Sequence, residues 1–257
     1  MTTAGGKVLQ ILGSYSHERP CSTLSELSRS LDLPLSTTHR IVGELVAWGA
    51  LERDEQGRYH VGLRLWEIGA LAPRGHGLRE VALPFLEDLY EITHENVQLA
   101  VRQDHEALVV ERITGRRAVS ILTQVGGRLP LPVTGVGQVL LAHAPLSVIN
   151  EVLAAPLPRF TPQTITDPRR MRSVLADVRA HGYALNDCQL TASSVSAAVP
   201  VWSMGQVVAA LSIVVAGNSV EQVRPLLPVI RAASRAISRG LGPTHTAADD
   251  SARALIR

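Results

Sequence analysis

A run of hydrogen-bonding side chains near the N-terminus offers the most specific chemistry in this sequence of 257 residues. It reads Ser36-Thr37-Thr38-His39-Arg40 and joins three hydroxyls to an imidazole and a guanidinium. At the start of a helix, such compact groups suit entry into the major groove of DNA. Hydroxyls and backbone amides would meet phosphates, and Arg40 would meet a phosphate or a guanine. The alternative is a solvated helix start rich in capping residues, which is commoner for such a run on its own.

The residues around this run predict the elements that would position it. Apolar residues at helical spacing predict a first helix over residues 7–15. Thr23 and Glu26 form the capping-box pattern that starts a short second helix. A third helix is predicted over residues 35–48, with Gly49 where a helix commonly ends. Two helices joined by a short turn indicate a helix-turn-helix, with the polar run at the start of its second helix.

Two strand-like segments follow the third helix. Residues 50–53 and 58–61 flank a glycine-containing turn at 54–57. Three helices followed by a two-stranded ribbon predict a winged helix-turn-helix. Arg53 and Arg58 would then contact phosphates from the wing.

Composition limits how DNA could be bound. The chain has 25 Lys and Arg against 23 Asp and Glu, a formal net charge of +2, and residues 1–60 hold six basic and seven acidic residues. This balance excludes a histone-like polycation and requires a local basic patch. Aromatic residues make up only 4% of the chain, which disfavours a stacking platform for single-stranded nucleic acid. Trp48 and Tyr59 are predicted to belong to the core.

Cysteine usage and hydropathy set the broad class of protein. Cys21 and Cys188 cannot form a disulfide framework, and zinc-binding spacings are missing. No apolar segment follows Met1 as in a signal peptide. The longest apolar stretch, residues 207–217, is far shorter than the roughly 20 residues needed to span a bilayer. We therefore expect a cytoplasmic protein without a membrane partner, metal or cofactor.

The middle of the chain predicts two further helices, at residues 63–72 and 78–93, with a break at 73–77 that contains Pro and Gly. Two interpretations are open for this region. It would either connect two domains and help them dimerise, or pack on a single fold.

From residue 97 the pattern changes to short strands mixed with helices. Strands are predicted at 97–101, 107–111, 118–122, 195–201 and 207–215, and helices at 137–143, 146–154, 168–181 and from about 219 to 239. This predicts an antiparallel α+β domain. Nucleotide-binding loops and hydrolase motifs do not occur in it, so no catalytic residue is predicted.

Several short motifs occur along the chain in an order and spacing that match those of a known protein family. They are Thr23-Leu-Ser-Glu-Leu, Leu33-Pro-Leu-Ser-Thr-Thr-His-Arg40, Leu45, Gly49, Arg58-Tyr-His-Val-Gly62, Val125-Gly, Pro130-Leu-Pro, Thr134-Gly-Val-Gly-Gln-Val-Leu-Leu-Ala142, Gly182-Tyr183, Ala197-Ala-Val-Pro-Val201 and Val208-Ala-Ala-Leu-Ser212. Each is weak alone. Because these motifs occur together in this order and spacing, the chain from about Lys7 to Leu241 resembles the IclR family of bacterial transcription regulators.

The resemblance implies a domain plan. Residues 1–62 would form the winged helix-turn-helix, 63–95 a helical linker and dimerisation region, 96–241 a GAF-like effector domain, and 242–257 a disordered tail. It also implies a homodimer or homotetramer that binds a palindromic double-stranded DNA operator and responds to a small organic effector. The candidate DNA contacts are Thr23, Ser36, Thr37, Thr38, His39, Arg40, Arg53 and Arg58.

The family's effector pocket can be transferred only where positions match. The backbone amides of Gly135 and Val136, at a helix start, suit an effector carboxylate. Asn186 falls where small-acid binders of the family carry an acidic residue. Ser196 falls where many members carry Cys, and Ser212 matches a common hydroxyl.

The remaining pocket positions imply a less polar effector than a two- or three-carbon keto acid. Val214 replaces a hydroxyl that many members carry, and Leu122, Leu129 and Leu131 would form an apolar wall. An aromatic or longer carboxylate is therefore expected. For each of the pocket residues, a place in the core or in a turn is the alternative.

A second class of function stays open from sequence alone. The second domain could belong to an enzyme or a small-molecule carrier, with residues 1–60 acting as a protein-interaction module. A winged helix can bind proteins, so its fold does not decide between the two.

Overall fold

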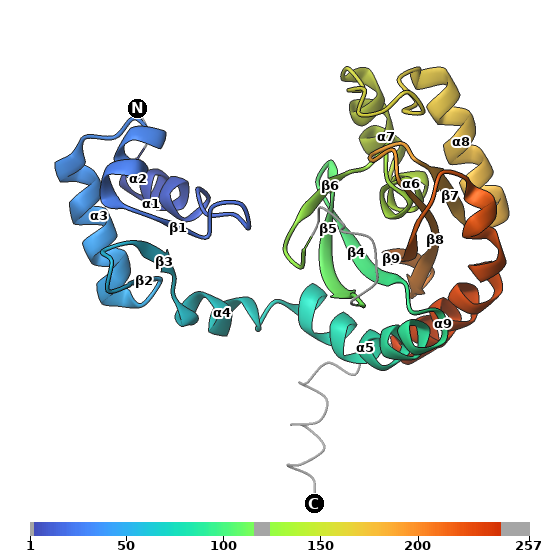
Figure 1. The fold of residues 1–257 in the computed structure, drawn as a ribbon, viewed down its shortest axis with the longest axis horizontal. Helices are drawn as coiled ribbons and strands as arrows, with labels where there is room; N and C mark the ends of the chain where they lie inside the picture. The colour runs from blue at the N-terminus through green and yellow to red at the C-terminus, as the bar shows by residue number, and fades with distance from the viewer. Residues whose placement is uncertain (1–2, 116–123, 243–257) are drawn as a thin grey trace, which may run out of the picture. The chain divides into compact units, whose positions relative to one another are not determined.

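The computed structural model describes residues 3–115 and 124–242. These residues divide into two compact units that meet between His76 and Gly77 (Figure 1). The strand predicted at 118–122 and the tail from residue 243 onward lie outside the described residues. No helix among the described residues is both long enough and apolar enough to cross a bilayer.

The first unit is a three-helix head with a small sheet and one further helix. Its elements are α1 (Ala4–Leu12), β1 (Cys21–Ser22), α2 (Leu24–Ser30), α3 (Leu35–Trp48), β2 (Leu51–Arg53), β3 (Tyr59–Val61) and α4 (Leu63–Gly69). The sheet is antiparallel in the order β1-β3-β2, so the predicted wing is present. Strand β1 was not predicted, because two residues are too few to show an alternating pattern.

The core of the first unit lies between its first three helices and strand β2. Ile11, Leu27, Ile41 and Leu51 are fully buried and come from α1, α2, α3 and β2. Burying each such side chain contributes about 1.5–3 kcal/mol. The prediction that Trp48 belongs to this core is wrong. Trp48 is 44% exposed, and its ring lies under the Arg64 guanidinium, 4.7 Å from the ring centre.

The second unit is built on a six-stranded antiparallel sheet with strand order β6-β5-β4-β9-β8-β7. Its strands are β4 (Asn96–Gln103), β5 (Glu106–Ile113), β6 (Arg128–Pro130), β7 (Ala184–Asp187), β8 (Ser194–Ser203) and β9 (Gln206–Ala216). Its helices are α5 (Pro73–Thr93), which enters this unit at Gly77, α6 (Gly135–Ala142), α7 (Leu146–Ala154), α8 (Pro168–His181) and α9 (Leu227–Gly240). Helices and antiparallel strands share one unit, so the predicted α+β class is confirmed.

Two hydrophobic cores cover the two faces of this sheet. Helices α6, α7 and α8 pack on one face, where Ala100, Ala198 and Ala210 meet Val136. Helices α5 and α9 pack on the other, where Leu99, Val199 and Leu211 are buried. Because neighbouring strand residues point to opposite faces, this alternation assigns each strand residue to one face of the sheet or the other.

Two helix starts and two strands differ most from the sequence prediction. Helix α5 begins at Pro73, so the predicted break at 73–77 is wrong; proline is tolerated at a first helical position because its missing N–H has no partner there. The last helix does not start near residue 219. Two 3-10 turns, Val220–Gln222 and Arg224–Leu226, come before α9. Strands β6 and β7 were missed because both are short.

Candidate DNA-contact and effector-binding sites

Helix α3 presents most of the predicted DNA-contacting run to solvent. Ser36, His39 and Arg40 are exposed, and Thr37 is half-buried. Pro34 occupies the N-cap position and supplies no side-chain acceptor to the first amides of the helix. Those amides are therefore available to an anion such as a phosphate.

Thr38 does not belong to this surface. Its side chain is fully buried, and its hydroxyl donates to the Pro34 carbonyl oxygen at 3.1 Å. The sequence run could not show this, because one residue in each helical turn of α3 must face the core beside Ile41 and Val42. The prediction that Thr38 contacts DNA is corrected: it is a packing residue.

Arg40 is held by a neighbour on its own helix. Its Nη1 lies 2.6 Å from Glu44 Oε1, and both side chains are about 60% exposed. An exposed pair one helical turn apart contributes little, so Arg40 can exchange Glu44 for a phosphate or base edge.

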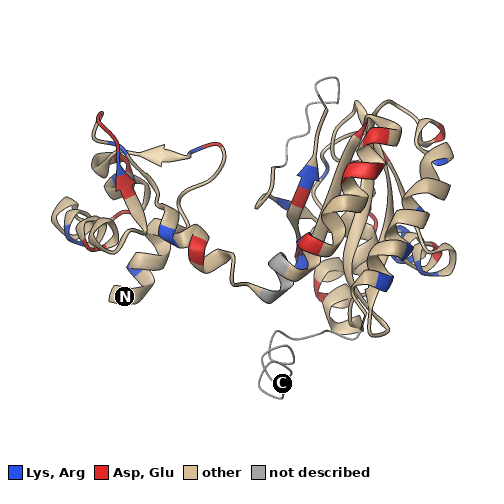
Figure 2. Cartoon of the chain, turned by 90° about the horizontal axis from the view of Figure 1, so that it is seen from below, with Lys and Arg blue, Asp and Glu red and all other residues tan. Residues whose placement is uncertain are grey.

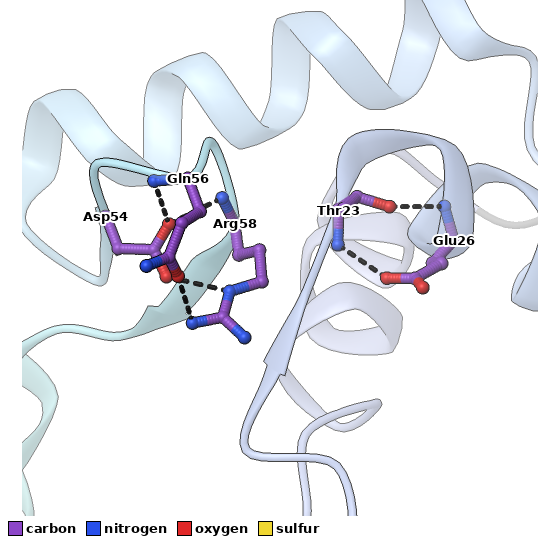
Figure 3. Close-up of polar contacts among 5 residues, drawn as sticks. All are labelled: Thr23, Glu26, Asp54, Gln56 and Arg58. Atoms are coloured by element: carbon purple, nitrogen blue, oxygen red, sulfur yellow. Dashed lines mark hydrogen bonds and ion pairs between the residues drawn. The ribbon is translucent and has the colours of Figure 1, made fainter.

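The turn of the wing is organised by one carboxylate (Figure 3). Asp54 accepts from the backbone amides of Gln56 at 3.0 Å and Arg58 at 2.9 Å, and its second oxygen lies 2.9 Å from Arg58 Nε. Arg58 also donates to Gln56 Oε1 at 2.5 Å. These hydrogen bonds, first the one from the Arg58 amide, lower the pKa of Asp54. Arg58 is therefore preorganised on the wing and partly neutralised by Asp54.

Arg53, on the neighbouring strand of the wing, is exposed. Its guanidinium lies over the Tyr59 ring, 5.7 Å from the ring centre. This contact positions the charge on an exposed side chain, so the predicted phosphate contact is compatible with its position.

Thr23 carries out the capping predicted for it (Figure 3). Its hydroxyl accepts from the Glu26 amide at 3.3 Å, and its own amide donates to Glu26 Oε2 at 2.7 Å. The backbone hydrogen bond is the main reason that the pKa of Glu26 is lowered. The Thr23 hydroxyl keeps its own proton, so a phosphate contact is compatible with this role.

Charge on the first unit is mixed rather than concentrated. Acidic and basic residues are interspersed over its helices and strands (Figure 2), as the count of six basic and seven acidic residues up to position 60 requires. A DNA contact must therefore come from a few aimed side chains.

In the second unit, the start of α6 offers two backbone donors. Thr134 caps the helix by accepting from the Gly137 amide at 3.1 Å, and its carbonyl accepts from Gln138 at 2.8 Å. The amides of Gly135 and Val136 have no acceptor among the described residues. Both residues are buried, so the positive end of the helix dipole acts in a dry environment.

The sheet brings the predicted polar residues to the same face as α6. Asn186 of β7 pairs with Ser196 of β8, and Ser212 of β9 pairs with Ala198 of β8. A side chain on Gly135 would meet Ser196 Oγ at 2.7 Å and Ala198 Cβ at 3.3 Å. The start of α6 thus lies directly over this part of β8.

Asn186 has a defined structural task. Its side-chain amide donates to the Val133 carbonyl at 3.1 Å, and its oxygen accepts from the Gln189 amide at 3.4 Å. Val133 precedes the α6 cap, so Asn186 anchors the segment that leads into this helix.

Gln98 is a polar residue of this face that the sequence prediction missed. It lies on β4, directly opposite Ser212, and it is only 2% exposed. The signal was available: a glutamine interrupts the apolar strand Val97-Gln-Leu-Ala-Val101, and buried glutamines are rare unless paired.

Two of the three leucines of the predicted apolar wall lie in the core of the second unit. Leu129 and Leu131 are buried and pack in the same core as Val136. Leu122 lies outside the described residues. The described part of the chain also holds no group of three or more His, Cys, Asp or Glu placed to bind a metal ion.

The close approach of α6 and β8 can be tested by substitution. Gly135→Ala should lower the free energy of unfolding by about 1–3 kcal/mol, because its Cβ would overpack against Ser196 Oγ. Ser196→Ala in the same chain should recover most of that loss, measured by urea denaturation as a double-mutant cycle. Gly137→Ala is the matched control: its Cβ would lie 2.3 Å from the Leu131 carbonyl oxygen, so Ser196→Ala should not rescue it.

Comparison with known proteins identifies relatives of both parts of the chain. Residues 72–239 match the family model described as "Bacterial transcriptional regulator IclR C-terminal", and residues 6–55 match "IclR helix-turn-helix domain". The HTH-type transcriptional regulator BhcR of Paracoccus denitrificans is 31% identical over 234 residues, 88% of this chain and 83% of the relative. The HTH-type transcriptional regulator XynR of Escherichia coli is 29% identical over 241 residues, 92% of this chain and 96% of the relative.

A solved structure is similar over nearly the same length. It is an IclR homolog from Microbacterium hydrocarbonoxydans complexed with 4-hydroxybenzoate, 38% identical, with a TM-score of 0.89 over 93% of this chain and 99% of that chain. These matches confirm the prediction of a DNA-binding transcriptional regulator rather than an enzyme. Residues 6–55 match a helix-turn-helix model, which removes support for a protein-interaction module at residues 1–60.

Proposed function

Because the chain belongs to the IclR family of bacterial transcriptional regulators, we propose that it senses an aromatic carboxylate beside α6 and thereby changes how it binds a palindromic DNA operator. The observation that carries this proposal is the pair of buried, unpaired amides at Gly135 and Val136. Such a pair at a helix start binds a carboxylate, and a ligand can bias only those conformations that it binds unequally.

The apolar part of the effector follows from the residues near this helix. Leu129, Leu131 and Val136 share one core, and Asn186 is neutral and already hydrogen-bonded. This environment favours a carboxylate on an apolar ring over a small keto acid. The Microbacterium homolog, 38% identical, holds 4-hydroxybenzoate, which belongs to that chemical class.

Titration calorimetry with the full chain tests the effector class. We expect saturable binding of benzoate or 4-hydroxybenzoate and much weaker binding of pyruvate and glyoxylate. Tight binding of the keto acids alone would overturn the proposal, because it would require a polar pocket that these residues do not build.

For the operator, we propose contacts from Ser36, Thr37, His39 and Arg40 of α3, supported by Thr23 and by Arg53 and Arg58 of the wing. These side chains are exposed, or they keep a hydrogen-bonding group that is free to contact DNA, and this supports the proposed set of contacts. Thr38 is left out because it is buried. The affinity for non-specific DNA depends on how many phosphates the basic side chains neutralise. Because the charge of the first unit is mixed, we expect this non-specific affinity to be weak.

We place the dimer contact on α4 and the residues that follow it. Trp66 is 70% exposed and Leu71 is 79% exposed in one chain, beside the exposed Leu63 and Ile68. Exposed apolar clusters of this kind commonly mark protein interfaces. A second copy would bring a second DNA-binding unit, which a palindromic operator requires. This keeps residues 63–95 as the proposed linker and dimerisation region, with α4 in the first unit and α5 crossing into the second unit at Gly77.

Trp66→Glu should convert the dimer to a monomer at micromolar concentration, because it places a charge in an apolar contact. Analytical ultracentrifugation measures the change. Met204→Glu is the matched control, since Met204 is 77% exposed in the β8–β9 turn. Loss of the dimer in the control but not in the Trp66 variant would place the contact elsewhere.

A further inference from the structure

We propose that Gln98 and Ser212 form a second polar subsite, which receives an oxygen on the far side of the effector from its carboxylate. This inference rests on the proposed function and deepens it. It assigns one residue, Gln98, that decides which aromatic acids are recognised.

Two buried hydrogen-bonding groups without partners carry the inference. Gln98 is 2% exposed and Ser212 is 1% exposed. Neither the side-chain nitrogen of Gln98 nor the hydroxyl of Ser212 has a hydrogen-bond partner among the described residues. A buried amide or hydroxyl left unpaired destabilises the fold, so two such groups side by side call for a ligand-related reason.

Strand register places the two groups together. Gln98 of β4 and Ser212 of β9 are directly opposite in an antiparallel pair, so their side chains lie on the same face. Ser212 in turn pairs with Ala198 of β8. That face is the one covered by α6, because Ala198 packs in the same core as Val136.

The same register relates this pair to the proposed carboxylate position. The start of α6 lies over β8 at Ser196 and Ala198, whereas Gln98 lies two strands away on β4. Two interstrand spacings amount to about 10 Å. The cross-strand row runs from Ala198 of β8 through Ser212 of β9 to Gln98 of β4, so Ser212 lies about 5 Å and Gln98 about 10 Å from Ala198. This separation suits a ligand with polar groups at opposite ends of one ring.

The hydrogen-bonding groups of Gln98 and Ser212 indicate which group of the effector would bind between them. The amide nitrogen of Gln98 can only donate, whereas the hydroxyl of Ser212 can donate or accept. A phenolic hydroxyl opposite the carboxylate would accept from Gln98 and donate to Ser212, so that all three groups are paired. A ring that carries only hydrogen there would leave both protein groups unpaired, which is how a polar site rejects an apolar analogue.

Calorimetry with 4-hydroxybenzoate and benzoate on the full chain tests this. The wild type should bind 4-hydroxybenzoate about tenfold or more tightly than benzoate. Gln98→Leu should bring the two affinities within about twofold of each other, chiefly by weakening 4-hydroxybenzoate. Ser212→Ala should act in the same direction.

A thermal-unfolding measurement without ligand separates a binding role from a structural one. Gln98→Leu removes an unpaired polar group at similar volume, so its melting temperature should equal or exceed that of the wild type. Ser234→Ala is the matched control. Ser234 is 4% exposed in α9, and its hydroxyl donates to the Pro200 carbonyl at 2.6 Å. This control should melt earlier and keep the wild-type affinity ratio.

The outcomes are distinct. If Gln98→Leu weakens both acids equally, or melts earlier with an unchanged ratio, Gln98 is structural and the subsite is disproved. If the wild type binds neither acid, the proposed effector class fails and the subsite fails with it. If the wild type binds both acids and only the variant loses the preference, the subsite is established.

Discussion

Arg40→Ala is expected to weaken operator binding by about 1–3 kcal/mol, which corresponds to roughly 5- to 150-fold in affinity. Arg40 lies in the first turns of α3, is exposed, and has Glu44 as its ion-pair partner. Because that pair is exposed, DNA can displace Glu44 at little cost. Fluorescence anisotropy with an operator selected from random duplexes would measure the loss.

Glu44→Ala is the matched control, because it breaks the same ion pair from the other side. It frees Arg40 and removes a negative charge near the DNA, so operator affinity should hold or rise. If both substitutions weaken binding equally, the ion pair itself matters, and Arg40 does not contact the operator. Effector binding should be unchanged in both variants, since α3 belongs to the first unit.

Gly62→Ala is expected to lower the stability of the first unit by about 4 kcal/mol or more, which is exceptional for a single methyl group. A Cβ at this position would lie 2.2 Å from the Gly49 carbonyl oxygen and 3.2 Å from the Ala50 carbonyl carbon. Both contacts are with backbone, so no side chain can rotate away. The Gly62 amide also donates to the Ala50 carbonyl at 2.8 Å, and moving the chain would break that hydrogen bond.

Hydrogen exchange read by mass spectrometry would locate the loss within α1–α4 and β1–β3. Gly43→Ala serves as the control, because an ideal Cβ there has nothing within 4 Å and sits in the interior of α3. It should stabilise the helix by about 0.5–1 kcal/mol. Normal protection in the Gly62 variant would show that the two segments do not approach as closely as described.

Features set by neighbouring residues were predictable from the sequence. The capping box at Thr23 and Glu26, the end of α3 at Gly49 and the start of α8 after Asp167 all occur where the sequence indicated. Each depends on hydrogen bonds within one helical turn, so the residues that make the signal also make the structure. The helix-turn-helix and the wing follow from such local signals.

Which residues share a surface was decided only by the tertiary structure. Thr38 looked equivalent to its neighbours in the run from Ser36 to Arg40, yet helix packing buries it. Gln98 and Ser212 are more than a hundred positions apart in sequence, and only the pairing of β4 with β9 places them opposite one another. Sequence alone thus determined the DNA-reading elements, because their contacts are local. The make-up of the proposed effector site required the fold, because its residues come from strands whose register is set by the whole sheet.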